Sequence, residues 1–200
     1  MRDNALVISG LLVDKVGGPS VKPYQPGGYW DFLNFPLRTY EPDKGEKLYR
    51  RGMYTWWQRT FLNPSLLAFD APSHEECTAM RVQSNTPQQA LTLLNDVTYV
   101  EAARVLAERM IKHGGSSDTD RIQWAFARAV SRPAKQQEVD VLAELLTKHR
   151  EAFKANAEES KKLIATGDAP PAKDVDATEL AAWINVARAI LNLHETITRN

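Results

Sequence analysis

Apolar residues recur at steps of three and four positions through most of the second half of the chain. Leu142, Leu146 and Phe153 have this spacing, and residues 180–191 repeat it. Side chains spaced in this way lie on one face of a helix. The pattern predicts a small bundle of amphipathic helices over residues 118–200.

Helix starts are marked by side chains that accept hydrogen bonds from the first free backbone N–H groups. The stretch TPQQ at 86–89 fits a capping box with proline at the first helical position, and Asp96 follows as the cap of the next helix. SHEE at 73–76 fits a second box and predicts a short helix through Cys77. Later starts are expected at Ser117 or Asp118 and at Asp176.

The stretch at 48–61 (LYRRGMYTWWQRTF) is predicted to form a further helix. Met53, Trp56 and Trp57 lie near one face of it, as in a helix packed on a core. Asn63-Pro64 is expected to end this helix, because proline cannot continue the hydrogen-bond ladder.

The segment 19–28 contains three prolines and two glycines, and is predicted to be extended or turned. An opening helix is expected before it, from Asp3 or Asn4 to the glycines at 17–18. The aromatic rings near the segment, Trp30 among them, are expected to anchor it across a helical core. The alternative is that these rings form a stacking platform for sugars.

These elements predict an all-α fold. We expect an irregular multi-helix domain with a helical bundle in the C-terminal half and a long Pro/Gly/aromatic loop segment near the N-terminus. Residues 1–200 are interpreted as a single domain fragment, with a motif-rich half at 1–113 and a bundle half at 118–200. No stretch alternates apolar and polar residues over the length of a strand.

Composition narrows the possible partners. The 200 residues carry 25 Lys and Arg against 25 Asp and Glu, so the formal net charge is zero. This balance argues against broad capture of nucleic acid. No apolar run approaches the length of a membrane span. One cysteine allows no internal disulfide, and without a Cys-x-x-Cys-His motif this chain attaches no c-type haem, so no cofactor is expected in it.

Several long motifs resemble one family. They are RDNALVISGLL (2–12), GGPSVKPYQP (17–26), YRRGMYTWWQRT (49–60), NPSLLAFDAP (63–72) and NTPQQALTLLND (85–96). They resemble domain of unknown function 1553, the C-terminal domain of large planctomycete proteins whose upstream parts are cytochrome-c-like. The resemblance spans the whole chain, is strongest from Arg2 to Arg109, and covers only the C-terminal half of that domain.

The resemblance implies a cellular setting for the protein. It implies a secreted or periplasmic multidomain protein associated with the use of complex, often sulfated, polysaccharide. Its partners are then the upstream domains of the same parent protein, and any c-type haem belongs to those other domains. The family supplies no established catalytic residue.

The sharpest binding hypothesis is a site for an acidic or sulfated polysaccharide. Arginine forks match sulfate and carboxylate oxygens, and capped helix starts offer free N–H groups to an anion. The candidate residues share a place in or near the aromatic stretch: Trp30, Arg50, Arg51, Trp56, Trp57, Arg59, Asp70, Arg81, Asn85 and Thr86. The alternative, which we favour, is that the arginines pair with Asp and Glu and hold the domain together.

Two further sets of residues are candidates for chemistry. Asp70 is a general base if it is buried with a raised pKa, but capping or an ion pair is the commoner use, and no second acid clearly pairs with it. His74 and Cys77 lie one helical turn apart, but two ligands are fewer than a zinc site requires. A free cysteine is more often a small buried apolar residue.

Three functions therefore remain open. The first is a non-catalytic interaction or scaffold domain. The second is a carbohydrate-binding module that uses Trp30, Trp56, Trp57 and the arginines. The third is an enzyme acting on polysaccharide, with Asp70 as its base. A cleft lined by arginine and tryptophan favours the second, and two facing carboxylates favour the third.

Overall fold

A computed structural model describes residues 1–32, 39–59, 61–80 and 84–197, and over these residues the fold is all-α, as predicted. The helices are α1 (Arg2–Ser9), α2 (Pro64–Ala68), α3 (Pro87–Asn95), α4 (Val97–His113), α5 (Asp118–Val130), α6 (Gln136–Ala155), α7 (Ala157–Ile164), α8 (Ala177–Leu191) and α9 (His194–Ile197). Short 3-10 helices cover Tyr29–Phe32, Gly45–Tyr49 and Gly52–Tyr54.

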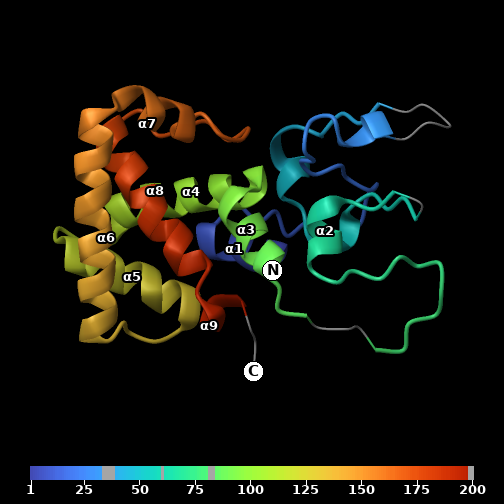
Figure 1. The fold of residues 1–200 in the computed structure, drawn as a ribbon, viewed down its shortest axis with the longest axis horizontal. Coiled ribbons are helices and arrows are strands. Elements are labelled where there is room, and N and C mark those ends of the chain that lie inside the picture. The colour runs from blue at the N-terminus through green and yellow to red at the C-terminus, as the bar shows by residue number, and fades with distance from the viewer. Residues whose placement is uncertain (33–38, 60, 81–83, 198–200) are drawn as a thin grey trace.

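The helices and the irregular segments occupy different sides of the molecule. Figure 1 shows α4 to α8 on one side, an irregular part around α2 on the other, and α1 and α3 between them. None of the described helices is both long and apolar enough to cross a membrane.

The core is centred on α8, which packs against both α4 and α6 (Figure 1). Nine residues of α8 are buried, including the fully buried Trp183, so this helix is apolar around most of its circumference and has to be enclosed. Among the buried residues of α4 are Ala102, Ala103 and Ala107, whose small side chains let neighbouring helices approach closely.

Four of the helix starts from α3 onward follow the predicted caps. Thr86 and Gln89 form the capping box of α3, and the carboxylates of Asp96 and Asp176 accept from backbone N–H groups of α4 and α8. Ser117 caps α5 in the same way. Because each cap satisfies donors that a helix cannot satisfy itself, short local motifs fix where these helices begin.

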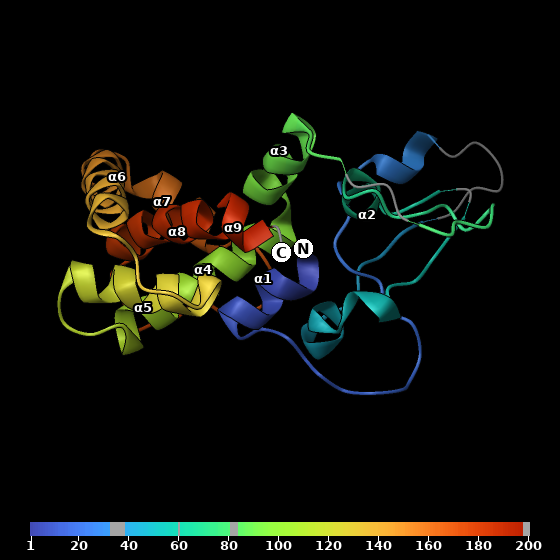
Figure 2. The same ribbon diagram turned by 90° about the horizontal axis from the view of Figure 1, so that it is seen from below.

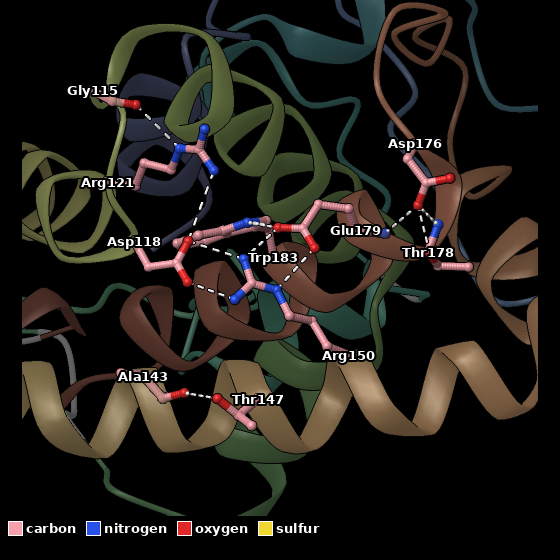
Figure 3. Close-up of polar contacts among 10 residues, drawn as sticks. All are labelled: Gly115, Asp118, Arg121, Ala143, Thr147, Arg150, Asp176, Thr178, Glu179 and Trp183. Atoms are coloured by element: carbon pink, nitrogen blue, oxygen red, sulfur yellow. Dashed lines mark hydrogen bonds and ion pairs between the residues drawn. The ribbon is translucent and has the colours of Figure 1, made fainter.

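An ion-pair network ties three helices of the bundle together (Figure 3). Arg150 of α6 contacts Asp118 at the start of α5 and Glu179 in the first turn of α8, each at 2.5 Å. Glu179 also accepts a hydrogen bond from the Trp183 indole at 2.8 Å. Hydrogen bonding to Arg150 lowers the pKa of both carboxyl groups.

The prediction of a helix over 48–61 is wrong. The backbone forms 3-10 turns at Gly45–Tyr49 and Gly52–Tyr54, and residues 55–59 are not helical. The carbonyl groups that a helix would use accept other donors. The Arg2 guanidinium binds the carbonyls of Leu48 and Arg50, and the Val13 N–H binds that of Tyr49 at 3.0 Å. Tertiary hydrogen bonds thus replace the helical ladder.

Three other boundaries differ from expectation. The opening helix ends at Gly10, which adopts a left-handed conformation (φ 85°) and closes α1 with bonds to the carbonyls of Leu6 and Val7. Asn63 begins α2 as its cap, with proline at the first helical position, and does not end a helix. Residues 73–76 are not helical, and His74 has a φ of 64°.

A buried carboxylate joins the irregular part to the bundle. Glu101 of α4 is fully buried and accepts hydrogen bonds from the hydroxyls of Tyr49 (2.8 Å) and Tyr24 (3.1 Å). It also accepts from the Ala169 N–H at 2.7 Å and lies 3.6 Å from the Arg104 guanidinium. A buried charge requires such partners, so this network specifies how the two parts dock.

Candidate functional site

A groove of about 530 Å³ opens between the start of α1, α2 and the irregular segments on either side of α2. Its lining is mainly apolar and aromatic: Met1, Arg2, Asp3, Gly52, Met53, Trp57, Ser65, Leu66, Phe69, Ala71, Pro72, His74 and Tyr99. Concave sites of this size with a few polar groups are the usual places for ligands.

One wall is fixed by the first residues of α1. Asp3 accepts a hydrogen bond from the Gly52 N–H at 2.6 Å, and its carboxylate lies 3.6 Å from the Arg2 guanidinium. A side chain at position 52 would begin 3.2 Å from the Asp3 carboxylate, which is tighter than ordinary packing. Glycine here therefore allows the segment of Met53 to lie directly against α1.

The opposite wall is an aromatic pair. Trp57 stacks on His74 with ring centroids 4.4 Å apart, and its indole N–H donates to the Ser73 carbonyl at 3.3 Å. The pair explains why a capping signal at 73–76 did not produce a helix, because the chain there is held by Trp57.

The floor of the groove is formed by aromatic side chains at the end of α2 and on α4. Phe69, which follows α2, meets Tyr99 of α4 edge-to-face with centroids 6.1 Å apart. Tyr99 is buried, and burial raises the pKa of its phenol. The floor thus presents apolar ring surface and no negative charge near neutral pH.

Asp70 holds the loop that follows the groove. It has a φ of 56°, and its carboxylate accepts from the Ser84 N–H at 2.8 Å, from the Ser84 hydroxyl and from the Gln89 amide at 3.3 Å. This arrangement closes the chain between α2 and α3. Asp70 does not line the groove.

Two of the predicted tryptophans lie in a different cluster. Trp30 is buried and stacks on Tyr40 (5.6 Å) and Trp56 (5.9 Å). The ammonium group of Lys22 lies 5.4 Å from the Trp56 ring. These rings anchor the Pro/Gly segment, and Trp57 is the one predicted tryptophan that reaches the groove.

The predicted arginines are not gathered at the groove. Arg50 is buried, stacks 3.8 Å from the Tyr54 ring and donates to the carbonyls of Lys15 (2.9 Å) and Pro19 (3.2 Å). It thereby holds the glycine turn at 17–18. Arg51 is exposed, 3.9 Å from Asp14.

The remaining candidates are also placed apart. Arg59 is exposed, as are Asn85 and Thr86 at the start of α3, and Arg81 lies outside the described residues. Thr86 uses its hydroxyl to cap α3. No group of three possible metal ligands occurs among the residues that the structure describes, and Cys77 is exposed.

Sequence reasoning missed most of the lining. Met53 was assigned to the apolar face of a helix, yet 74% of its surface is exposed. Asp3 was expected only as a cap. No short motif marks either residue as part of a groove, because segments from four separate parts of the chain meet there.

Comparison with known families gives one result. A family model, PSD1, described as a protein of unknown function (DUF1553), matches residues 1–146. The chain belongs to the PSD1 family. No curated protein and no solved structure matches the PSD1 chain. The matched residues include the whole groove, while α8, which fills the centre of the bundle, follows them.

Proposed function

We propose that this PSD1 chain is a non-catalytic interaction domain whose groove binds an extended peptide segment with apolar side chains next to a basic one. The main support for this proposal is the composition of the groove lining. The side chains of Met53, Leu66 and Trp57 supply apolar surface, and Asp3 is the one carboxylate among the described lining residues. Flexible thioether side chains adapt to apolar ligands of different shapes.

The partly exposed carboxylate of Asp3 supports a ligand that carries a basic side chain. The Asp3 side chain is 40% exposed and has oxygen atoms that accept from a cation or an N–H group. Hydrolysis of a glycosidic bond would require two facing carboxylates, which this lining does not provide. The proposed role is therefore recognition.

The cellular setting is part of the proposal and rests on the family resemblance. We propose an extracytoplasmic location, and upstream domains of the same parent protein as the source of the bound segment. The balanced charge of the chain supports a partner other than nucleic acid.

The test uses a defined peptide, acetyl-Lys-Leu-Phe-Lys-amide, titrated into ¹⁵N-labelled protein. We expect the indole N–H signal of Trp57 to shift in a saturable manner. Met53→Gln is expected to weaken binding about tenfold, because it replaces exposed apolar surface in the groove by an amide. Met80→Gln is the matched control, since Met80 is 85% exposed and lies outside the groove.

Asp3→Asn is the second variant in this titration. It should remove most of the preference for this peptide over acetyl-Glu-Leu-Phe-Glu-amide. The proposal fails if the Trp57 signal does not move with either peptide, or if Met53→Gln and Met80→Gln weaken binding equally.

A carbohydrate-binding role is the second candidate, favoured by the rigid Trp57 wall. A ring held by the Ser73 carbonyl and the His74 stack can present a fixed face to a pyranose. Neutral and sulfated oligosaccharides in the same titration separate the two roles. A Trp57 shift with an oligosaccharide and none with the peptides would replace the first proposal by this one.

A further inference from the structure

The carboxyl end of α1 is covered by an arginine from another helix. Gly10 ends α1 in a left-handed conformation (φ 85°), and a Cβ atom at this position would lie 2.2 Å from the Arg109 Nη1 atom. The absence of a side chain therefore lets Arg109 of α4 lie across the end of α1. Helices α1 and α4 pack against each other (Figure 2).

A second arginine reaches the same helix end from α5. Arg109 donates to the Ser9 carbonyl at 2.9 Å, and Arg128 donates to the carbonyls of Ile8 (2.7 Å) and Val7 (3.5 Å). Cations are favoured at a helix C-terminus, which accounts for these bonds. Each guanidinium carries five N–H donors, so the bonds to α1 leave most of them without an acceptor in the described part of the protein.

Both guanidiniums lie near one indole ring. The guanidinium carbons of Arg109 and Arg128 each lie 5.7 Å from the centroid of Trp124. Arg128 is exposed and Arg109 is half-buried. Val7, on the adjoining turn of α1, is 49% exposed. We call Val7, Arg109, Trp124 and Arg128 the arginine-pair surface.

This pair differs from three other arginines of the bundle. Arg104, Arg132 and Arg150 each form an ion pair with at least one carboxylate. No described carboxylate lies within ion-pair distance of Arg109 or Arg128. Burial and the nearby charge of Arg128 lower the pKa of Arg109, as expected for two like charges without a counter-ion.

We propose that the arginine-pair surface binds an acidic segment of a partner protein, with a carboxylate between the two guanidiniums and an aliphatic residue against Val7 and Trp124. Arginine binds carboxylates with two parallel hydrogen bonds, and free N–H donors remain on both guanidiniums. The apolar neighbours suit a Glu or Asp next to Leu. The inference is independent of the groove and of the function proposed for it.

The experiment uses a fluorescein-labelled probe, Glu-Glu-Leu-Glu-Glu-Leu, with fluorescence anisotropy at low ionic strength, where charge pairs are least screened. Arg109→Gln combined with Arg128→Gln is expected to weaken binding at least about tenfold. The matched control is Arg51→Gln, which removes one exposed charge elsewhere and should change affinity by less than about twofold. The indole N–H signal of Trp124, assigned with Trp124→Phe, should shift on addition of the probe.

Two further variants keep the test decisive. Arg109→Lys with Arg128→Lys retains the charge but loses the planar fork, and should still weaken binding. If the double glutamine variant does not fold, as seen in its thermal unfolding, Arg128→Gln alone replaces it, because Arg128 is exposed.

Three outcomes would overturn the proposal. One is unchanged probe binding in the folded arginine variants. Another is an equal loss in Arg51→Gln, which would show attraction by overall charge only. The third is tighter binding of dextran sulfate than of the peptide at the same two arginines, which would assign the surface to an anionic polysaccharide.

Discussion

The bundle and the irregular part (residues 10–86) satisfy their backbone groups in opposite ways. In the bundle the hydrogen bonds run within helices, and caps such as Asp176 complete the ends. In the described residues of the irregular part, several groups bond to side chains distant in sequence, and others form backbone pairs such as that of Val13 with Tyr49. Arg50 holds the turn at 17–18, Asp43 accepts from the Lys22 N–H, and Tyr40 donates to the Pro23 carbonyl.

The two regions should therefore lose stability in different ways when a side chain is removed. The bundle depends on apolar volume that many residues share, whereas the irregular part depends on single polar side chains. Substitutions that remove one side chain from each region measure the contrast directly.

The largest effect is expected for Trp183→Ala. Trp183 is fully buried in the centre of the bundle, and truncation of such a ring costs about 3–5 kcal/mol of unfolding free energy. Urea denaturation followed by circular dichroism measures the loss. Val141→Ala, at a 65% exposed site on α6, is the control and should change stability by less than about 0.5 kcal/mol. A loss below 1 kcal/mol for Trp183→Ala would contradict the central place of α8.

A smaller and more local effect is expected for Arg2→Met. This change removes the donors of the Leu48 and Arg50 carbonyls, at a cost of about 2–4 kcal/mol. Hydrogen exchange should show lost protection around residues 48–57 while the amides of α8 stay protected. Equal loss of protection in both regions would mean that they open as one unit.

The smallest effect is expected for the loss of stability at acidic pH. Arg150 lowers the pKa of Asp118 and Glu179, so these carboxylates stabilise the fold above their ordinary pKa values near 3.8 and 4.5, and this contribution is lost as the pH falls below them. The pairs are partly exposed, so about 0.5–1 kcal/mol is expected. The stability difference between the native chain and Arg150→Met should begin to shrink below about pH 4.5 and decrease further as the pH falls through the lowered pKa values of the folded state. A constant difference would rule out a role for these pairs in acid unfolding.

The bundle was predictable because its signals are local. Apolar spacing in α6 and α8 and the caps at Thr86, Asp96 and Asp176 act within a few residues. The stretch 48–61 was not, since its conformation depends on Arg2 and Val13, more than 30 positions earlier in the chain. Propensity within the stretch carries no information about those partners.

The candidate site was likewise difficult to predict from local sequence. Of the aromatic residues predicted for a site, Trp57 lines the groove. The role of Arg50 depends on the carbonyls of the 15–19 turn, which composition does not reveal. The pairing of Arg109 with Arg128 depends on how three helices pack, so neither residue stood out in the sequence.

The buried Glu101 has a consequence for synthesis on the ribosome. Residues 10–86 emerge before α4, but Tyr24 and Tyr49 bind a carboxylate on α4, and the same carboxylate needs the Ala169 N–H. The early part of the nascent chain therefore lacks its docking site until the loop at 169 has been made. We expect a chain ending at residue 165 to remain protease-sensitive over residues 10–86. Resistance there would show that this part folds before the bundle is complete.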